Sequence, residues 1–434
     1  MVVPKGYKST EVGVIPEDWE CAFIDDVLSE ISMGPFGSDI TVSNFKTSGV
    51  PVLNGYNVNS VMLNDVIVNY VTPEKAKSLK KAVARRGDIV VTHRGTIGQI
   101  AVIPMSAKYD RYVISQSQFR VSINQTKALS HYIVLYFHTN KGQRYLLDKK
   151  GHTGVPALAQ PTSNFRKLKF PCPSIPEQAA IVEALTDTDN MIVSLEKLIA
   201  KKKAIKQGAM QELLTGKRRL TGFDGKWVEK TLGSIFTFSG GVSASRDQLS
   251  DKGYYYLHYG DIHNSSKQYI DTFMDRFLIP KLDIEISKVP SSALLNDGDV
   301  VFVDASEDDE GASKHIVIRN KEKASFIAGL HTIVAKPISN DLDNCFKEYC
   351  FQMNHIKTQF KYYCAGTKVT GISKMNIEKI KLFYPINTVE QAAIASILSD
   401  MDTEIARLEK KLTKYRFIKQ GMMHELLTGR IRLV

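Results

Sequence analysis

A long internal repeat constrains this chain more than any other feature. The segment SIPEQAAIVEALTDTDNMIVSLEKLIAKKKAIKQGAMQELLTGKRRL returns as NTVEQAAIASILSDMDTEIARLEKKLTKYRFIKQGMMHELLTGRIRL, so that Glu177 recurs as Glu390, an offset of 213 residues. The copies align without a gap as far as Leu220 and Leu433. A repeat near half the length of a 434-residue chain predicts a duplicated module rather than a solenoid of short units.

Both copies have the heptad pattern of a coiled coil, because their apolar residues alternate at spacings of three and four. Each copy is about 40 residues long, which corresponds to roughly 60 Å of helix. Lys202, Lys206 and Lys419 interrupt the apolar seam, so we expect polar partners there. The residues predicted to pack in the seam are Ile181, Leu185, Ile192, Leu195, Ile199, Ile394, Leu398, Ile405, Leu408 and Leu412.

The ends of the two helices also carry matching signals. Ser174 with Glu177, and Asn387 with Glu390, have the spacing of a capping box. A glycine suited to the residue after a helix follows each copy, in the motif ELLTG. The chain's two tryptophans, Trp19 and Trp227, lie at equivalent places near the starts of the two globular parts, and we interpret both as packing anchors.

The composition favours a polyanionic partner, because the net charge is +11. A basic soluble protein without such a partner remains the alternative. The five cysteines have no zinc-binding spacing, no apolar run is long enough to span a membrane, and residues 1–13 have no signal-peptide core. We therefore predict a protein of the reducing cytoplasm, with no structural metal and no membrane partner.

The two globular parts follow one plan of short strands and turns with different residues in the loops. GPFGS, GVPVLNGYNV, RRGDIVVTHRGTIGQIAVI and SQSQFRV in the first part are answered by FSGGVSASR, KGYYYLHYGDI, NDGDVVFVDASEDDEGASKHIVI and IAGLHTIV in the second. A duplicated scaffold with divergent loops is suited to reading two different targets. The predicted boundaries are 1–173 and 221–386 for the globular parts, and 174–220 and 387–434 for the helices.

Motifs for chemistry are largely missing. The sequence has no phosphate-binding GxxxxGK[ST] loop, no GxGxxG loop and no Asp/Asn-Pro-Pro-aromatic motif of an adenine methyltransferase. The acidic loop 304–314 leaves a metal-dependent nuclease open as an alternative, although its counterpart THRGTIG contains no carboxylate. Asp304 and Ser306 could instead accept hydrogen bonds from a cytosine amino group, and a solvated acidic loop is a third interpretation.

Basic and amide side chains in the divergent loops are the better candidates for binding DNA. Arg94 lies in a loop beside a glycine, where it could approach a groove, and Gln116 and Gln118 could read adenine. For each residue, a surface position that contacts nothing is the alternative. The full candidate set is Ser38, Asn54, Tyr56, Lys81, Arg94, Thr96, Gln116, Gln118, Thr153, Ser243, Ser245, His258, Tyr259, Asp304, Ser306, His331, Thr367 and Lys368.

In these features the chain resembles the specificity subunit of type I restriction-modification systems. The resemblance is carried by IPEDW before the first globular part, the two EQAAI…LLTG helices and the two strand-rich parts with Gly-Asp turns. It implies an α+β fold with two target recognition domains in pseudo-twofold arrangement, separated by two long antiparallel coiled-coil helices. The HTGVPALAQ loop departs from the Ser/Thr-rich sequences of many family members.

The resemblance also implies a function and partners. Each target recognition domain would read one half of a bipartite site in double-stranded DNA, and the helices would set the spacer. The chain would have no catalytic residue, metal or cofactor of its own. Two modification subunits would supply S-adenosylmethionine-dependent adenine methylation, and restriction subunits would supply ATP- and Mg-dependent cleavage. The competing hypotheses are a self-sufficient nuclease or methyltransferase that uses the loop 304–314, and a coiled-coil adaptor that needs no DNA.

Overall fold

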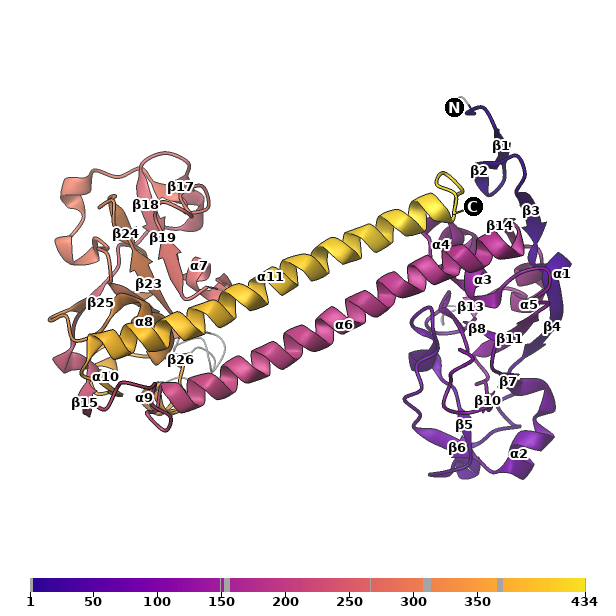
Figure 1. The fold of residues 1–434 in the computed structure, drawn as a ribbon, viewed down its shortest axis with the longest axis horizontal. Helices are drawn as coiled ribbons and strands as arrows, with labels where there is room; N and C mark the ends of the chain where they lie inside the picture. The colour runs from indigo at the N-terminus through magenta and orange to yellow at the C-terminus, as the bar shows by residue number, and fades with distance from the viewer. Residues whose placement is uncertain are drawn as a thin grey trace. The chain divides into compact units, whose positions relative to one another are not determined.

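The structure is a computed structural model of the chain. It describes residues 3–148, 150–151, 157–265, 267–306, 314–364 and 370–433, with the backbone alone at residues 150, 151, 306 and 370. The chain divides into two compact units, which contain its two globular parts (Figure 1). Unit 1 is Met1–Glu196 with Lys410–Val434, and unit 2 is Lys197–Glu409. Each unit therefore holds one globular part, the start of the helix that follows it and the end of the other helix.

The globular part of unit 1 is built on a sheet of strand order β4-β11-β8-β9 and a second sheet of order β6-β5-β10-β7. Short helices cover the first sheet and contribute to the same core. The bounds are β1 Tyr7–Thr10, β2 Gly13–Pro16, β3 Glu20–Phe23, α1 Ile24–Val27, β4 Leu28–Met33, β5 Val50–Val52, β6 Asn69–Val71, α2 Pro73–Ser78, β7 Val83–Arg85, β8 Ile89–Thr92, β9 Ile100–Val102, β10 Arg111–Val113, β11 Gln118–Ile123, α3 Ser130–Phe137, α4 Asn140–Leu147, β12 Lys150–Gly151, β13 Ala157–Leu158, α5 Pro161–Arg166 and β14 Lys169–Cys172.

The globular part of unit 2 repeats this plan with a sheet of order β16-β25-β21-β23-β19 and a second of order β17-β20-β18-β24. The bounds are β15 Trp227–Thr231, β16 Phe236–Gly240, β17 Leu249–Ser250, β18 Tyr254–Leu257, α7 Tyr259–Asn264, β19 Tyr269–Asp271, β20 Lys281–Leu282, β21 Val300–Val303, β22 Ala305–Ser306, β23 His315–Arg319, β24 Phe326–Ala328, β25 Thr332–Pro337, α8 Asn344–Cys350, α9 Asn354–Tyr363, β26 Thr370–Gly371, α10 Lys374–Ile377 and β27 Lys381–Pro385.

Strand register shows that the first sheets of the two units are equivalent, and that the second sheets are equivalent too. The first residue of β11 pairs with the last residue of β8, and the first residue of β25 pairs with the last residue of β21. In the second sheets, β10 pairs parallel with β5 and β24 pairs parallel with β18. These strands are rich in buried Val, Ile and Phe, residues that suit a pleated strand packed on both faces. The segments that the sequence predicts to be equivalent in the two globular parts therefore occupy equivalent places in the fold.

A Gly-Asp turn precedes the central strand of each unit. Gly87 and Gly298 have φ of +85° and +83°, a conformation that costs a glycine little. The next residue closes the turn: the Asp88 carboxylate accepts from the Arg85 amide at 2.8 Å, and the Asp299 carboxylate accepts from the Asn296 amide at 2.8 Å. The turn thus directs β8 and β21 through the middle of their sheets.

The repeated segments form the long helices α6, Ile175–Leu213, and α11, Thr388–Leu426, of 39 residues each. In unit 1 the start of α6 lies beside the end of α11, because Ile181 and Leu185 share a core cluster with Leu426 (Figure 1). In unit 2 the start of α11 packs in the same way against the end of α6. The helices are therefore antiparallel. Of the predicted seam residues, Leu408 and Leu412 are half-buried and the others are buried.

The lysines in the seam each meet a carboxylate on the other helix. Lys206 Nζ lies 2.6 Å from Asp402 Oδ1, and Lys419 Nζ lies 2.6 Å from Asp189 Oδ1. Lys202 pairs with Glu404 at 2.7 Å. The expectation of polar partners at these positions is confirmed, and opposite charges at fixed places favour one register of the pair.

The start of each long helix is clamped to the end of the other by a buried glutamate. In unit 1, Arg432 binds both oxygens of Glu177, with Nη2 2.8 Å from Oε2, and the Trp19 Nε1–H donates to Oε2 at 3.1 Å. In unit 2, Arg219 binds Glu390 through two hydrogen bonds of 2.6 and 2.8 Å. Hydrogen bonding to Glu177 raises the pKa of Arg432, so the guanidinium stays charged. We call these contacts clamp 1 and clamp 2.

The clamps correct the prediction of two capping boxes. Glu177 and Glu390 are directed to arginines rather than back to the residue that precedes the helix. At the start of α11 the Asn387 side chain does cap, because it accepts from the Val389 amide at 2.9 Å. The interpretation of the tryptophans as packing anchors is confirmed for Trp19, which is buried in the unit 1 core.

Candidate nucleic-acid interface

Four loops meet at one edge of unit 1, which we call loop edge 1: residues 34–38, 54–56, 93–99 and 115–118. The Gly34 amide donates to Gln118 O at 2.8 Å, and a Cβ at Gly34 would lie 2.0 Å from Ser115 O, so only glycine fits there. The His93 amide donates to Ser117 O at 2.9 Å. The sheet therefore brings loops that are distant in sequence to one surface.

Most predicted residues of loop edge 1 face solvent. Ser38, Tyr56, Arg94, Thr96 and Gln116 are exposed, and the Thr96 hydroxyl donates to Gln99 at 2.9 Å. Exposure makes them available to a ligand, and their role in DNA binding stays a prediction.

Gln118 and Asn54 hold the loops together instead. Gln118 is fully buried; its Oε1 accepts from the Ser115 amide and its Nε2 donates to Asn54 O, both at 3.0 Å. Asn54 is half-buried, and its Oδ1 accepts from the Tyr56 amide at 2.9 Å. The prediction that Gln118 reads adenine is wrong, because its side chain points inward from the first residue of β11 and both ends of its amide are engaged.

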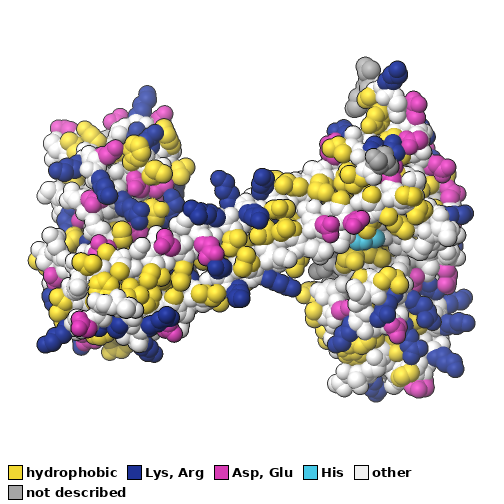
Figure 2. All heavy atoms as spheres, viewed as in Figure 1, with side chains coloured by type: hydrophobic (Ala, Val, Ile, Leu, Met, Phe, Trp, Pro, Cys, Tyr) yellow, Lys and Arg dark blue, Asp and Glu magenta, His cyan; other side chains and the backbone are white. Residues whose placement is uncertain are grey.

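Lys81 belongs to a basic surface beside the second sheet. It is exposed on a 3-10 turn, Lys80–Ala82, and its carbonyl accepts from Arg120 Nε at 2.9 Å. Figure 2 shows Lys and Arg side chains gathered over the end of unit 1 that carries α2 and β7. Such a surface supplies affinity for phosphates without sequence preference.

Sequence reasoning missed His93, which organises loop edge 1. Its backbone O accepts from the Leu158 amide at 2.8 Å, and its ring Nε2 lies 3.2 Å from Gln116 O. Burial lowers the pKa of this imidazole, which favours the neutral ring. The adjacent Arg94 forms a backbone bridge with Ala157. His93 thus contacts Gln116 through its ring and Leu158 through its backbone, directly beside Arg94. The one sign of this role in the sequence was the position of His93 in the HRG segment.

The equivalent loops of unit 2, residues 241–246, 258–261, 304–306 and 329–331, form loop edge 2. A Cβ at Gly241 would lie 1.9 Å from Gly329 O, which repeats the close approach at Gly34. The Val242 amide donates to Ala328 O at 2.8 Å, and the Tyr256 hydroxyl donates to Val242 O at 2.7 Å. The two edges therefore share their backbone architecture.

Aromatic and imidazole rings cluster on loop edge 2. The Tyr259 ring centroid lies 4.5 Å from that of His258 and 5.5 Å from that of His331. His331 Nδ1 lies 3.3 Å from Asp304 Oδ1. Burial, followed by the charge of Arg246, lowers the pKa of His258, whose Nδ1 accepts from the Gly260 amide at 3.0 Å. The structure thus brings together four residues that the sequence singled out separately.

Two serines complete the described part of loop edge 2. Ser243 and Ser245 are exposed, and the Ser245 amide donates to Gln248 Oε1 at 2.8 Å. Arg246, which sequence reasoning missed, pairs with Asp261 at 2.7 Å. Thr153, Thr367 and Lys368 lie outside the described residues, and only the backbone of Ser306 is described.

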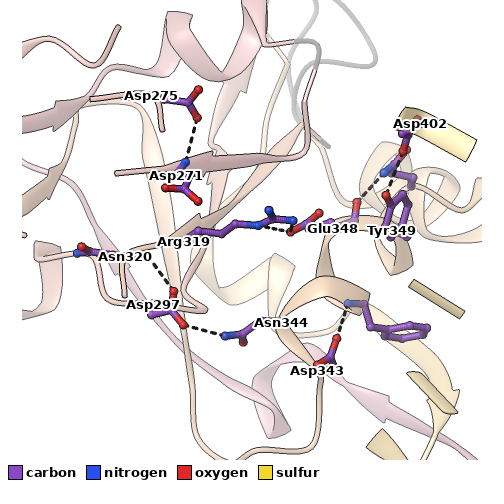
Figure 3. Close-up of polar contacts among 12 residues, drawn as sticks. Asp271, Asp275, Asp297, Arg319, Asn320, Asp343, Asn344, Glu348, Tyr349 and Asp402 are labelled. Carbon is purple, nitrogen blue, oxygen red and sulfur yellow. Dashed lines mark hydrogen bonds and ion pairs between the residues drawn. The ribbon is translucent and has the colours of Figure 1, made fainter. Parts of the chain in front are cut away.

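A polar network supports the side of unit 2 that packs on the helices, as Figure 3 shows. Arg319 Nη2 lies 2.6 Å from Glu348 Oε1, and burial raises the pKa of this carboxyl. The Tyr349 hydroxyl donates to Asp402 at 3.0 Å, next to the Lys206 pair. A groove of about 560 Å³ runs between α8, β19 and the long helices at this place. The network connects α8, which follows β25 in the sequence, to α6 and α11.

Neither a metal site nor a membrane-spanning helix is found among the described residues. No group of three His, Cys, Asp or Glu side chains within them is arranged to hold a metal ion. No helix in the described ranges is both long and apolar enough to cross a membrane. The two loop edges present hydrogen-bonding side chains at the edges of their sheets.

A family model decides between the interpretations of these surfaces. The model described as type I restriction modification DNA specificity domain matches residues 16–207 and 224–414, which includes both globular parts and most of each long helix. The chain belongs to this family. It is a type I restriction-modification specificity subunit with a role in recognising DNA, and the two matches coincide with the two modules of the repeat.

One relative resembles this chain over its whole length, and another resembles half of it. A Methanocaldococcus jannaschii protein named as a type I restriction enzyme MjaX specificity subunit is 26% identical over 436 residues, which span 99% of this chain and 97% of the relative. The MjaVIII specificity subunit of the same organism is 27% identical over 218 residues, half of each chain. The MjaX relative therefore matches both modules of this chain in one full-length alignment.

Solved structures share the fold. The S subunit of a type I restriction-modification system from M. genitalium aligns with a TM-score of 0.55 at 14% identity and covers 98% of both chains. A structure from work on complex assembly and conformational transition of the type I R-M system aligns with a TM-score of 0.57 at 15% identity, over 96% of this chain and 99% of that chain. The α+β architecture with two strand-rich domains and two long helices is therefore the architecture of this family.

Proposed function

We propose that loop edge 1 and loop edge 2 each read one half of a bipartite site in double-stranded DNA. The observation that carries this proposal is the combination of one backbone architecture with two sets of exposed side chains. A duplicated reader with identical loops would need a symmetric site, whereas these loops differ at nearly every exposed position. Arg94 and Gln116 on edge 1, and Asp304 and His331 on edge 2, are the side chains we expect to approach base edges.

The chain acts in this proposal without catalysis or cofactors of its own, in the cytoplasm where the DNA is accessible. Two modification subunits supply S-adenosylmethionine and the methyl transfer, and restriction subunits supply ATP- and Mg-dependent cleavage. We place docking of the modification subunits on the outer faces of the helices, because large apolar side chains are exposed there: Met191, Val193, Leu198, Ile205, Phe417 and Ile418.

The test is to map methylated adenines in DNA from cells that express the chain with its modification subunits. We expect two short half-sites separated by a spacer of fixed length. The purified chain alone, incubated with DNA, Mg²⁺ and S-adenosylmethionine, should neither cut nor methylate. Turnover by the chain alone would show that it carries its own chemistry, and a single uninterrupted motif would contradict two readers.

The helices set the spacer in this proposal. The seam ion pairs join α6 to α11, so a heptad must be added to both helices to keep the pairs in register. One heptad lengthens a helix by about 10 Å, which equals about three base pairs of DNA. The doubly extended chain should methylate the same half-sites with a spacer about three base pairs longer. An altered half-site would contradict the separation of spacing from base reading.

A further inference from the structure

Asp304 occupies a place on loop edge 2 that has no acidic counterpart on loop edge 1. It directly follows β21, as His93 follows β8, because Val303 pairs with Thr332 in the register in which Thr92 pairs with Gln118. Edge 1 presents a donor, the guanidinium of Arg94, immediately after this position. Edge 2 presents a carboxylate, which when ionised can only accept hydrogen bonds.

Asp304 is held by two backbone hydrogen bonds and one side-chain contact. Its amide donates to His331 O at 3.2 Å, its carbonyl accepts from the Ile372 amide at 2.8 Å, and its Oδ1 faces His331 Nδ1 at 3.3 Å. Within the described part of the chain the buried Oδ1 accepts no hydrogen bond, so the ring nitrogen lies near it without a directed hydrogen bond. The side chain as a whole is 35% exposed although Oδ1 is buried, so the rest of the side chain is open to solvent.

His331 is itself held in position. Its φ of +59° is unusual for a residue with a side chain, and the Tyr259 ring packs against its imidazole nearly edge-on, at an interplanar angle of 83°. Tyr259 in turn stacks on His258. A chain of packed rings therefore fixes the group that faces Asp304, and a fixed acceptor is what discrimination between base edges requires.

A carboxylate at a DNA interface repels phosphates, and it also repels the O6 and N7 acceptors of guanine and the O4 acceptor of thymine. In the major groove it is favourable only opposite an exocyclic amino group, which cytosine N4 and adenine N6 present there. We propose that Asp304 is a specificity-determining residue that accepts a hydrogen bond from such an amino group in the half-site of unit 2, and that His331 is its positioning residue. This inference rests on the proposed function.

The test uses the complex of the full chain with its modification subunits, and methylation of a duplex panel in which every base pair of the bipartite site is replaced in turn. Asp304→Asn, which preserves the size of the side chain, should reduce discrimination at one base pair of the unit 2 half-site by roughly tenfold or more. The other positions and the other half-site should be unchanged. The preferred base at the affected position distinguishes cytosine from adenine as the source of the amino group.

Two substitutions at His331 test positioning. Asn tolerates the left-handed backbone and keeps a polar side chain beside Asp304, so His331→Asn should retain discrimination at the same base pair, whereas His331→Ala should lose it. Arg94→Ala is the control and should affect the other half-site alone. An unchanged preference in Asp304→Asn, or an equal loss at every position, would overturn the inference while leaving two-part recognition intact. A wild-type complex without a bipartite site would overturn the proposed function as well.

Discussion

The two units differ least where they hold the helices and most where they face outward. Clamp 1 and clamp 2 use the same Arg–Glu pair, whereas loop edge 1 presents Arg94 and loop edge 2 presents Asp304 and a cluster of rings. The clamps are not identical, however, because Glu177 also accepts from Trp19 while the indole N–H of Trp227 has no partner in the described structure. The repeated residues therefore hold the helices together, and the divergent residues are those to which we assign selectivity in the proposed function.

The largest expected effect is a loss of unfolding free energy that differs between the two clamps. Arg219→Ala leaves Glu390, whose side chain is 1% exposed, as a buried charge without a cation, and should cost about 3–5 kcal/mol of unfolding free energy. Arg432→Ala should cost less, because the second pair that it breaks, with Asp18, is 65% exposed and Trp19 still donates to Glu177. Chemical denaturation of each variant, with hydrogen exchange at Trp19 and Trp227 to locate the change, measures both.

The control for clamp 2 is the neighbouring Arg218, which is 74% exposed and pairs with Glu212 at 3.5 Å. Exposed pairs are worth about 0–1 kcal/mol, so Arg218→Ala should have little effect. An equal loss for Arg218→Ala and Arg219→Ala would show that the buried pair is not what stabilises the clamp.

The second prediction sharpens the contrast between the reading surfaces. Arg94→Ala should weaken binding to one half-site by about 1–3 kcal/mol if the guanidinium binds a base edge, and leave the other half-site unchanged. Gel-shift titration of the complex on duplexes altered in either half measures this. Equal losses on every duplex would reassign Arg94 to phosphate contact.

The third prediction concerns the glycines after the two helices. Gly216 and Gly429 both have φ of +69°, which costs a non-glycine residue about 1–2 kcal/mol. A Cβ at Gly216 would lie 3.3 Å from the Trp227 ring, whereas one at Gly429 would lie 2.5 Å from Pro16 Cδ. Gly429→Ala should therefore lower the melting temperature more than Gly216→Ala; the reverse order would mean that clamp 1 tolerates change better than its contacts indicate.

The smallest expected effect is a pH dependence in unit 1. Burial lowers the pKa of His138, whose ring Nε2 lies 2.8 Å from Ile100 O, so the unfolded chain takes up its proton first as pH falls. The stability that the neutral ring contributes is thus complete above the unfolded pKa of about 6.5 and declines as pH drops below it. His138→Phe, which introduces the residue found at the equivalent Phe351, should reduce the loss of melting temperature between pH 7 and pH 5.5. An unchanged loss would assign it to other groups.

The heptad pattern predicted the helices, the gapless repeat predicted the equivalence of the loops, and the family resemblance supplied the antiparallel arrangement of the helices. Pairings between distant residues could not be predicted. The spacing of Glu177 matched a capping box, yet its partner Arg432 lies 255 residues away. Gln118 looked like a base reader because its polarity is visible in the sequence, while the inward direction of its side chain depends on the register of β11.

We infer that each globular part reads DNA independently and is held by its own clamp. The most direct measurement places the second globular part in both positions, with residues 227–386 replacing 19–173, and maps methylated adenines in cells that also express the modification subunits. Because α6 and α11 are equivalent in sequence and run antiparallel, we expect the methylated site to be an inverted repeat of the unit 2 half-site. Methylation at the original asymmetric site, or at a half-site unlike that of unit 2, would contradict it.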